Sequence, residues 1–443
     1  MTEISEHSPS SSTDRTNQPI EWTEIGVSGF KSFAEDTKIK LGALTILAGT
    51  NSSGKSSIMQ PFLLMKQTLE AAYDPGALLL DGPNISFTSS EQFITKIGMP
   101  YADSNNQVKI FIDLGGMSLK SIFQWSPKTG ISIYSQRYKE QELDTDITLQ
   151  PDMTSTEILQ VGDICYRDAF PDHLQVVRER CFLKAKSIGT SYEFGYGLFI
   201  GYLRSIIHVQ GIRGNPERVY KTAAVQGSVF SGQFENYVAS VIDRFQKENP
   251  EQLLKLQSIL QKLGLTDTIQ SQRLNDTQIE LRVGRVFGQS NVEDTVNIVD
   301  VGFGVSQVLP VVVALLVAQP GQLVYIEQPE IYLHPRAQIA LAEVFAEAAD
   351  RGVRIVVETH SELFLLGIQT LVAEDKLDPE SVKLHWFTRN PDGSSKVTTA
   401  ELDEVGAFGD WPEDFGSTAL GLENRYLSAT ETKLWHSATG SHG

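Results

Sequence analysis

The sequence predicts an α/β fold with a central parallel sheet flanked by helices, a β-rich N-terminal lobe, and a mixed, largely helical insert. Two stretches predict the sheet, because "QLVYIEQ" (322–328) and "VRIVVETH" (353–360) are continuous apolar runs that end in polar residues. Strands of this kind are typical of parallel sheets covered on both faces. A third stretch, residues 44–64, is an apolar run that breaks into small polar residues and resumes, which indicates a strand, a loop and a helix.

Composition and charge are those of a globular chain and limit its partners. The chain has 443 residues, of which 41% are hydrophobic and 21% charged, enough for two or three domains. The formal net charge is −18, so the overall field does not attract nucleic acid. A local basic groove stays open as an alternative without support from the charge. The two cysteines, Cys165 and Cys181, form no paired motif, which indicates a reducing compartment.

No membrane segment is visible in the sequence. The longest apolar run, residues 308–318, is far shorter than the ~20 residues that a membrane helix needs. The N-terminal residues are polar and partly acidic, without the basic start and apolar centre of a signal peptide. We therefore expect a cytoplasmic protein that does not associate with membranes.

Strands and helices can be assigned in chain order. Residues 22–50 are rich in β-branched and aromatic residues and predict strands, and residues 54–73 follow as a helix. Residues 85–135 again predict strands. Further on, "PEQLLKLQSILQKLGL" (250–265) is an amphipathic helix that ends at a glycine. Finally, "VKLHWFTRNPDGSSKVTTAEL" (382–402) predicts a hairpin around an Asn-Pro-Asp-Gly turn.

These patterns divide the chain into five expected segments. In chain order they are a disordered tail (1–20), an N-terminal lobe with the loop (21–139), an insert or lid (140–290), a C-terminal lobe (291–400), and a C-terminal extension (401–443). The insert has the least regular pattern, and we expect it to carry the specificity for a partner.

The loop Gly49-Thr-Asn-Ser-Ser-Gly54-Lys55-Ser56 has the spacing GxxxxGKS and lies between a strand and a helix. Its glycines let backbone N–H groups curl around phosphates, and the helix N-terminus adds a partial positive charge. We expect Lys55 to reach the β- and γ-phosphates of a nucleotide and Ser56 to ligate Mg²⁺. The alternative is a plain glycine- and serine-rich turn, which would not require every fixed position of the motif.

Polar residues follow the other two apolar strands. Glu327 ends a buried strand, where a carboxylate is costly unless it meets a cation, so we expect it to hold Mg²⁺ directly or through water. His360 follows the next strand and is placed to contact the γ-phosphate. The alternatives are a solvent-exposed glutamate and a structural histidine.

A second glycine-rich helix start lies at Gly302 and Gly304, before a long apolar helix. Its free N–H groups suit a further phosphate contact. One nucleotide does not need two such helix starts and the loop from the same chain, so we expect a dimer in which this segment caps the nucleotide of the other subunit. A plain helix cap is the alternative.

These motifs together are similar to those of a known family. "GFKSF" (29–33), the loop, "VGFGVSQVLPVV" (301–312), "VYIEQPEIYLHP" (324–335) and "VVETHSE" (356–362) resemble ABC-type AAA ATPases related to RecF, the SMC proteins and the OLD nucleases. The likeness is greatest to bacterial AAA-family ATPases with a C-terminal region of unknown function.

Two further stretches resemble that bacterial subgroup. They are "IHVQGIRGNPERVYK" (207–221), which is similar to its central motif, and "AFGDWPEDF" (407–415), which is similar to its C-terminal region.

The resemblance implies an ABC/SMC-like P-loop NTPase head that closes as a homodimer, or a larger homo-oligomer, around ATP and Mg²⁺. The phosphate loop would consist of Gly49, Thr50, Asn51, Ser52, Ser53, Gly54, Lys55, Ser56 and Ser57. The other implied site residues are Lys31 and Ser32 near the nucleotide, Gln92 as glutamine-loop residue and metal ligand, Gly302 and Gly304 as the signature, Glu327 as the Walker B acid, and His360 as the switch histidine.

The sequence departs from the family pattern at two places. The family has a catalytic glutamate directly after the Walker B acid, whereas here Gln328 follows Glu327. A glutamine cannot accept the proton of an attacking water, although it can orient that water. Glu330 is the nearest replacement, so we expect slow hydrolysis and a long-lived ATP-bound dimer. The signature lacks its usual serine and glycine order, and Ser306 is the candidate serine.

His334, in the "LHP" that follows Glu330, either lines the dimer interface or simply begins a helix. The OLD nucleases carry a nuclease domain after the ATPase. The residues after His360 lack the clustered carboxylates of such a domain, so we expect no cutting of nucleic acid.

The resemblance suggests an ATP-hydrolysing dimeric switch in prokaryotic anti-phage defence or genome maintenance, acting with an effector protein. A nucleotide-dependent scaffold without hydrolysis is one alternative, favoured by Gln328. A RecF-like DNA-binding repair factor is another, disfavoured by the charge of −18. A transporter ATPase would have a glutamate at position 328.

Overall fold

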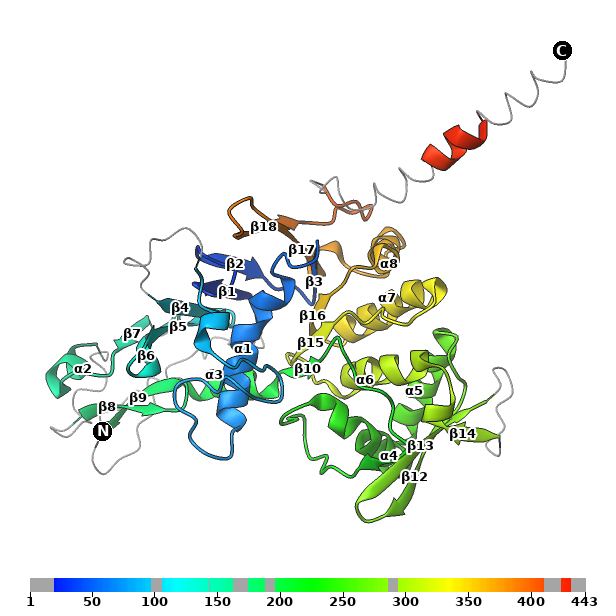
Figure 1. The fold of residues 1–443 in the computed structure, drawn as a ribbon, viewed down its shortest axis with the longest axis horizontal. Coiled ribbons are helices and arrows are strands. Elements are labelled where there is room, and N and C mark those ends of the chain that lie inside the picture. Colours follow the sequence, from blue (N-terminus) through cyan, green and yellow to red (C-terminus); the bar gives the residue numbers. More distant parts are fainter. Residues whose placement is uncertain are drawn as a thin grey trace, which may run out of the picture.

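The computed structural model describes residues 20–96, 106–142, 144–161, 174–187, 196–285, 294–409 and 424–431 (Figure 1). Several predictions from the sequence fall outside these residues. They concern the expected tail apart from residue 20, residues 97–105 of the predicted strand region 85–135, Cys165, and most of the expected C-terminal extension (401–443), including most of "AFGDWPEDF" (407–415). Among the described helices, none combines the length and the apolar character that a bilayer crossing requires.

A six-stranded sheet forms the centre of the molecule. Its strand order is β10–β15–β16–β3–β17–β18, and all neighbours run parallel except the antiparallel pair β17–β18. The strands are β10 (Ile207–Val209), β15 (Leu323–Glu327), β16 (Arg354–Glu358), β3 (Leu44–Gly49), β17 (Val382–Arg389) and β18 (Ser395–Ala400). The predicted α/β fold with a central parallel sheet is confirmed, as is the hairpin after residue 382.

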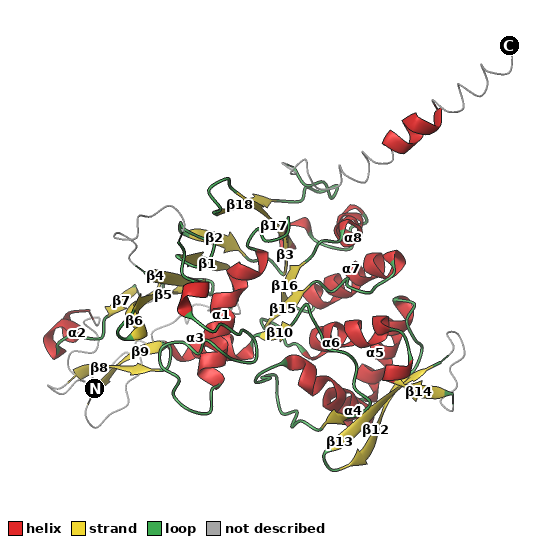
Figure 2. Ribbon diagram, viewed as in Figure 1, coloured by secondary structure: helices red, strands yellow, loops and turns green. Residues whose placement is uncertain are grey.

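Helices cover both faces of this sheet (Figure 2). Successive residues of β15 alternate between two cores, with Leu323 and Tyr325 in one and Val324 and Ile326 in the other. This explains why the predicted strands are apolar throughout. The helices of the first core include α1 (Lys55–Glu70) and α3 (Tyr196–Ser205), and those of the second include α6 (Phe303–Val317), α7 (Pro335–Asp350) and α8 (Glu362–Ala373).

An antiparallel sheet packs against the α1 side and forms the expected β-rich lobe. Its order is β2 (Thr37–Lys40), β1 (Glu24–Ser28), β4 (Gln107–Asp113), β5 (Met117–Ser126), β6 (Gly130–Glu140) and β7 (Thr145–Leu149). β4 alternates strictly between buried and half-buried side chains, as expected for a sheet with one face on the core.

The middle of the chain is mixed, as expected. The helix predicted at 250–265 is present as α5 (Pro250–Lys262), with Pro250 in its first turn and the Asn249 side chain accepting from Gln252 N. The other helices and strands of this part are α2 (Ser155–Val161), β8 (Leu174–Glu179), β9 (Phe182–Ser187), β11 (Tyr220–Lys221), α4 (Val238–Glu248), β12 (Ile269–Asn275), β13 (Gln278–Gly284) and β14 (Thr295–Asn297). Short 3₁₀ turns occur along the whole chain, at Ser90–Gln92, Phe234–Tyr237, Ile298–Asp300 and Pro379–Ser381.

The segment expected as an insert contributes strands to both large sheets. β7 closes the antiparallel sheet after residue 140, and β10 forms the edge of the parallel sheet beside β15. A boundary at residue 140 would therefore divide the antiparallel sheet. β10 has three residues, too few for a periodic pattern, so its place in the central sheet could not be read from the sequence.

Candidate functional site

The loop between β3 and α1 has a conformation that only glycine permits at two positions. Gly49 and Gly54 have φ values of 139° and 108°. A Cβ atom at Gly49 would lie 2.2 Å from the Phe387 carbonyl oxygen, and one at Gly54 would lie 2.5 Å from Ser395 Oγ. The glycines therefore let the loop lie against β17 and β18 while its backbone curls at the start of α1.

Lys55 holds its ammonium group inside this loop. Its Nζ donates to the carbonyl oxygens of Gly49 at 3.0 Å and Thr50 at 2.7 Å. Burial lowers the pKa of Lys55, and the nearby carboxylate of Glu358 opposes this shift. A buried cation at a helix N-terminus is an arrangement that favours an anion.

A cavity of about 490 Å³ opens over the loop. This is an ordinary size for a small-molecule site. It brings together the expected residues Lys31, Ser32 and Gln92 with the loop, although they come from separate segments. The lining residues are Lys31, Ser32, Ser52, Ser53, Gly54, Lys55, Ser56, Ser57, Gln60, Gln92, Ile94, Lys96, Glu358 and Arg389.

Four cationic side chains line the cavity, and two of them, Lys96 and Arg389, were missed in the sequence. They follow no motif, so only the fold reveals them. Burial lowers the pKa of Lys31, whose Nζ lies 4.9 Å from the centre of the Phe87 ring. The buried hydroxyl of Ser53 makes no hydrogen bond with the described residues. The cavity thus offers positive charge and a spare polar atom, which fits a phosphate-bearing ligand.

Two of the expected residues at the cavity, Ser32 and Gln92, form hydrogen bonds with other parts of the protein. Ser32 Oγ accepts a hydrogen bond from Ser395 Oγ at 2.6 Å, which ties the segment around Lys31 to β18. The Gln92 side chain accepts from Thr88 N and donates to Thr88 Oγ1, both at 2.9 Å. Gln92 therefore lines the cavity, but its amide is engaged within its own turn, and its role as a metal ligand stays a prediction.

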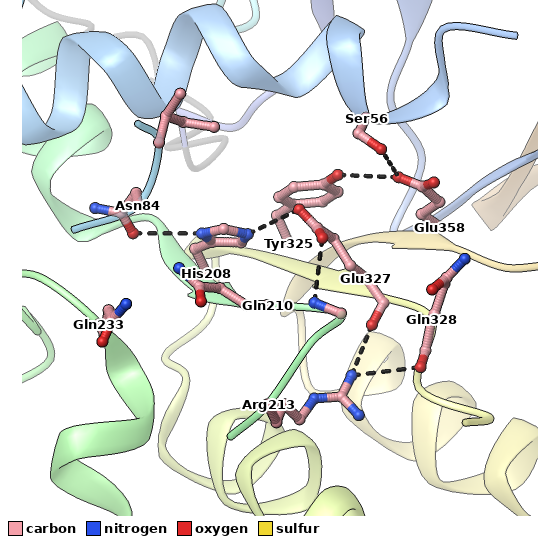
Figure 3. Close-up of polar contacts among 12 residues, drawn as sticks. Ser56, Asn84, His208, Gln210, Arg213, Gln233, Tyr325, Glu327, Gln328 and Glu358 are labelled. Carbon is pink, nitrogen blue, oxygen red and sulfur yellow. Dashed lines mark hydrogen bonds and ion pairs between the residues drawn. The ribbon is translucent and has the colours of Figure 1, made fainter. Parts of the chain in front are cut away.

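Glu358, at the end of β16, is the carboxylate that contacts the loop (Figure 3). Its Oε2 accepts from Ser56 Oγ at 2.7 Å and from the Tyr325 hydroxyl at 3.2 Å. Burial raises the pKa of Glu358, and the neighbouring charge of Glu327 adds to the effect. Glu358 was not among the residues predicted from the sequence, although it ends an apolar strand as Glu327 does.

Glu327, the expected partner of the loop, is held by other groups. Its Oε1 lies 3.0 Å from His208 Nε2, and its Oε2 accepts from Gly211 N at 3.1 Å. Burial would raise the pKa of Glu327, but the His208 contact and the Gly211 hydrogen bond outweigh it, and the pKa is lowered. His208 stacks on Tyr325 at 5.2 Å, and its Nδ1 faces Asn84 Oδ1 at 3.3 Å (Figure 3).

The central motif "IHVQGIRGNPERVYK" (207–221) therefore has a structural explanation. Besides His208 and Gly211, it supplies Arg213, which is buried and donates to the carbonyl oxygens of Glu327 at 2.6 Å and Gln307 at 3.1 Å. Burial lowers the pKa of Arg213 to about 10. The motif therefore forms hydrogen bonds with the last residue of β15 and connects that strand to α6.

Gln328, Glu330 and His360 gather where β15 and β16 end. Gln328 has a φ of 43°, and its N–H donates to the Glu358 carbonyl oxygen at 2.7 Å. Glu330 Oε1 accepts from His360 N at 2.8 Å, whereas its buried Oε2 makes no hydrogen bond with the described residues. Burial raises the pKa of Glu330, and burial together with Lys55 lowers the pKa of His360.

The expected signature lies apart from the cavity. Gly302 precedes α6 as its N-cap, and neither it nor Gly304 nor Ser306 lines the cavity formed by the described residues. Ser306 Oγ donates to the Phe303 carbonyl oxygen at 2.9 Å. His334 is the N-cap of α7, with Nδ1 accepting from Arg336 N at 3.3 Å. This contact agrees with the structural alternative for His334.

Comparison with known proteins adds a family match for part of the chain. Residues 210–366 match the family model described as "AAA domain, putative AbiEii toxin, Type IV TA system". The matched part contains the signature segment, Glu327 and His360, whereas the phosphate loop lies outside it. None of the curated proteins matches the sequence.

Solved structures that resemble the chain include three SMC heads, each at 12% identity. One is the SMC head bound to the C-winged helix domain of ScpA, with a TM-score of 0.43 over 87% of this chain and 98% of that chain. A second is the SMC head domain from Thermotoga maritima, with 0.36 over 86% and 100%. A third is the Smc head domain with an extended coiled coil bound to the C-terminal domain of ScpA derived from Pyrococcus furiosus, with 0.43 over 86% and 96%.

Proposed function

We propose that this chain, which carries an AAA domain at residues 210–366, binds ATP with Mg²⁺ and hydrolyses it slowly. One observation carries the proposal. The phosphate loop, with Lys55 at its centre and Ser56 hydrogen-bonded to Glu358, lines a cavity with further cationic side chains. The loop's spacing and its place between a strand and a helix are those of a nucleotide phosphate site.

The residues around the cavity have distinct tasks in this proposal. The loop's N–H groups and the N-terminus of α1 bind the phosphates, and Lys55 exchanges its contacts with the Gly49 and Thr50 carbonyl oxygens for phosphate oxygens. Lys31 and Arg389 add positive charge from the cavity wall. Bound Mg²⁺ would neutralise the charge on the transferred phosphoryl group, and Ser56 with the neighbouring carboxylates would hold it.

Slow hydrolysis follows from the position of the candidate base. Gln328 takes the place of the usual glutamate and cannot accept a proton. Glu330, two residues further on, is the nearest replacement because Glu327 is held by His208 and Gly211, and the Oε2 of Glu330 is buried without a hydrogen bond to the described residues. Burial raises the pKa of Glu330, which makes its carboxylate a stronger base than that of an exposed glutamate. We assign Glu330 as the base, and His360, whose N–H holds Glu330, as the residue that faces the γ-phosphate.

The chain would act as a dimeric switch. The signature segment lies outside the cavity of its own chain, so it is free to cap the nucleotide of a second copy. Closure around ATP would change the surface shown to an effector protein. The family description names a toxin of a type IV TA system, which agrees with a role in prokaryotic defence. A scaffold that binds ATP without hydrolysis is the second candidate, and Gln328 favours it.

ATP turnover by the purified chain tests the proposal. We expect slow turnover that disappears in Lys55→Ala and in Glu330→Gln, and that persists in Lys376→Ala, a surface control next to Glu374. Loss of a group that acts on the transition state typically costs about 10²–10⁴-fold. No turnover in the native chain, with turnover gained in Gln328→Glu, would establish the scaffold instead. Full turnover in Glu330→Gln would exclude Glu330 as the base.

A further inference from the structure

We infer that Glu358, rather than Glu327, supplies the carboxylate that faces the Mg²⁺ of the bound nucleotide. The inference rests on the proposed function and names the metal-facing residue of the same site. It reverses the order expected from the sequence, in which the glutamate after β15 holds the metal. Three features of the structure carry it.

The first feature is the contact between Ser56 and Glu358. In a phosphate loop of this spacing, the serine after the lysine is the protein's own ligand to Mg²⁺. Here its Oγ lies 2.7 Å from Glu358 Oε2, a separation at which two oxygens can serve as neighbouring ligands of one ion. Glu358 also lines the cavity beside Lys55 and Gln60, whereas Glu327 does not.

The second feature is that both carboxylate oxygens of Glu327 are engaged. Oε1 meets His208 Nε2 at 3.0 Å, and Oε2 accepts from Gly211 N at 3.1 Å. His208 is buried and faces Asn84 on its other side. A Cβ atom at Gly211 would lie 3.2 Å from Glu327 Oε2, so a side chain at this position would crowd the carboxylate. Turning Glu327 toward the loop would leave two buried donors without partners. Glu327 is thus a positioning residue that fixes the end of β15.

The third feature is the electrostatic position of Glu358. Glu327 and Glu358 are paired in register on neighbouring parallel strands, so their charges lie close together. Glu327 has an imidazole and an N–H beside it, whereas Glu358 has two hydroxyl groups and the more distant Lys55. The negative charge of Glu358 is therefore less compensated by its neighbours than that of Glu327, and a cation would stabilise it more. Among the described residues, no three His, Cys, Asp or Glu side chains form a metal cluster. This fits Mg²⁺, which is commonly held by one or two carboxylates together with nucleotide phosphates.

Binding of the slowly hydrolysed analogue ATPγS, measured by calorimetry in EDTA and across a Mg²⁺ titration, tests the inference. The variants are Glu358→Gln, Glu327→Gln and the matched control Glu362→Gln, which lies four residues after Glu358 in the first turn of α8. Both test variants keep the shape of the side chain. Thermal melting of each variant shows whether it is folded.

We expect the apparent affinity for Mg²⁺ to fall by about tenfold or more in Glu358→Gln and to change little in Glu327→Gln and in the control. A Mg²⁺ response lost in Glu327→Gln and kept in Glu358→Gln would overturn the inference, as would an equal loss in both.

Binding of ATPγS in EDTA tests the proposed function separately from the inference about Glu358. If the native chain bound no ATPγS with or without Mg²⁺, the proposed function would fail and the inference with it. If the native chain binds ATPγS in EDTA and Lys55→Ala does not, the proposed nucleotide binding is supported. This result does not depend on which glutamate variant weakens the response to Mg²⁺.

Discussion

Lys66 carries its charge inside the protein, on the buried side of α1. It forms an ion pair with Glu70 one turn later, and its Nζ donates to the carbonyl oxygens of Arg204 at 3.1 Å and Phe230 at 3.0 Å. Glu70 in turn accepts from Gly232 N at 3.0 Å. Burial lowers the pKa of Lys66, and the Glu70 carboxylate opposes the shift. This pair ties the helix that begins at the phosphate loop to α3 and to the segment around residue 230.

We predict that Glu70→Ala lowers the free energy of unfolding by about 3–5 kcal/mol, because it leaves a buried ammonium group without its counter-ion. Lys66→Met combined with Glu70→Leu is expected to cost less than Glu70→Ala alone, because it removes both charges and keeps apolar volume. Urea denaturation measures both. Lys376→Met, which breaks an exposed pair with Glu374, is the control and should leave the midpoint unchanged. A Glu70→Ala midpoint equal to that of the control would show that the buried pair adds no stability.

At the scale of the elements, Arg213 connects three parts of the site. It lies after β10, and its guanidinium donates to the last residue of β15 through the Glu327 carbonyl oxygen, and to α6 through the Gln307 carbonyl oxygen. The Gln307 side chain returns a hydrogen bond to the Gly214 carbonyl oxygen at 3.2 Å. The start of α6 and the end of β15 are therefore bonded to one side chain, so a shift of either element is resisted by the other.

We predict that Arg213→Gln loosens this connection and spares the phosphate loop. Amide hydrogen exchange in the first turns of α6 and in residues 328–334 should accelerate by about tenfold or more, because the freed carbonyl oxygens lose charge-assisted hydrogen bonds. The affinity for ATPγS in EDTA should stay within about threefold, because Arg213 does not line the cavity. Arg218→Gln, which removes an exposed pair with Asp300, serves as the control. Unchanged exchange in α6 would mean that Arg213 does not hold the two elements together.

The elements also show which parts of the fold and site a sequence can predict. Strands such as Leu323–Glu327 were predicted because both faces are buried, and the phosphate loop because its chemistry requires a fixed spacing. β10 was not predicted, because a strand of three residues is too short to show a periodic pattern. Glu358 and Arg213 were missed as site residues for another reason. Glu358 contacts Ser56, which is 302 positions away along the chain, and Arg213 contacts Gln307, which is 94 positions away. A single sequence does not show which distant residues come into contact in the folded chain.

At the scale of the whole molecule, the two hydrophobic cores meet at the parallel sheet, and the polar residues collect at one edge of it. Gly49, Glu327 and Glu358 are the last residues of three strands that run in the same direction. Ligands of α/β sheets bind outside the carboxyl ends of the strands, which is where these residues lie. The C-terminal edge of the sheet therefore holds the phosphate loop and both glutamates, whereas Lys31, Ser32 and Gln92 reach the cavity from segments outside this sheet.

The signature segment instead forms an exposed apolar surface. The rings of Phe303 and Tyr332 stack with their centres 5.8 Å apart, and the two residues are 49% and 68% exposed. Tyr332 also has a φ of 65°, so the fold holds an exposed aromatic residue in a conformation that favours glycine. Aromatic residues are enriched in contacts between protein chains, so this pair is a candidate contact with a second copy.

If the proposed ATP-dependent dimer forms through this surface, we predict that Phe303→Asp prevents it and leaves nucleotide binding by the monomer intact. A carboxylate in the centre of the interface would have to be buried without a partner, which costs several kcal/mol and shifts the dimer equilibrium by about 100-fold or more. Sedimentation velocity with Mg²⁺ and ATPγS measures the dimer, and calorimetry at low protein concentration measures binding. Leu254→Asp is the matched control, because Leu254 is an aliphatic side chain that is 64% exposed on another helix, α5. A dimer that survives Phe303→Asp, or that Leu254→Asp abolishes equally, would place the contact between subunits elsewhere and remove the signature from the nucleotide of the second copy.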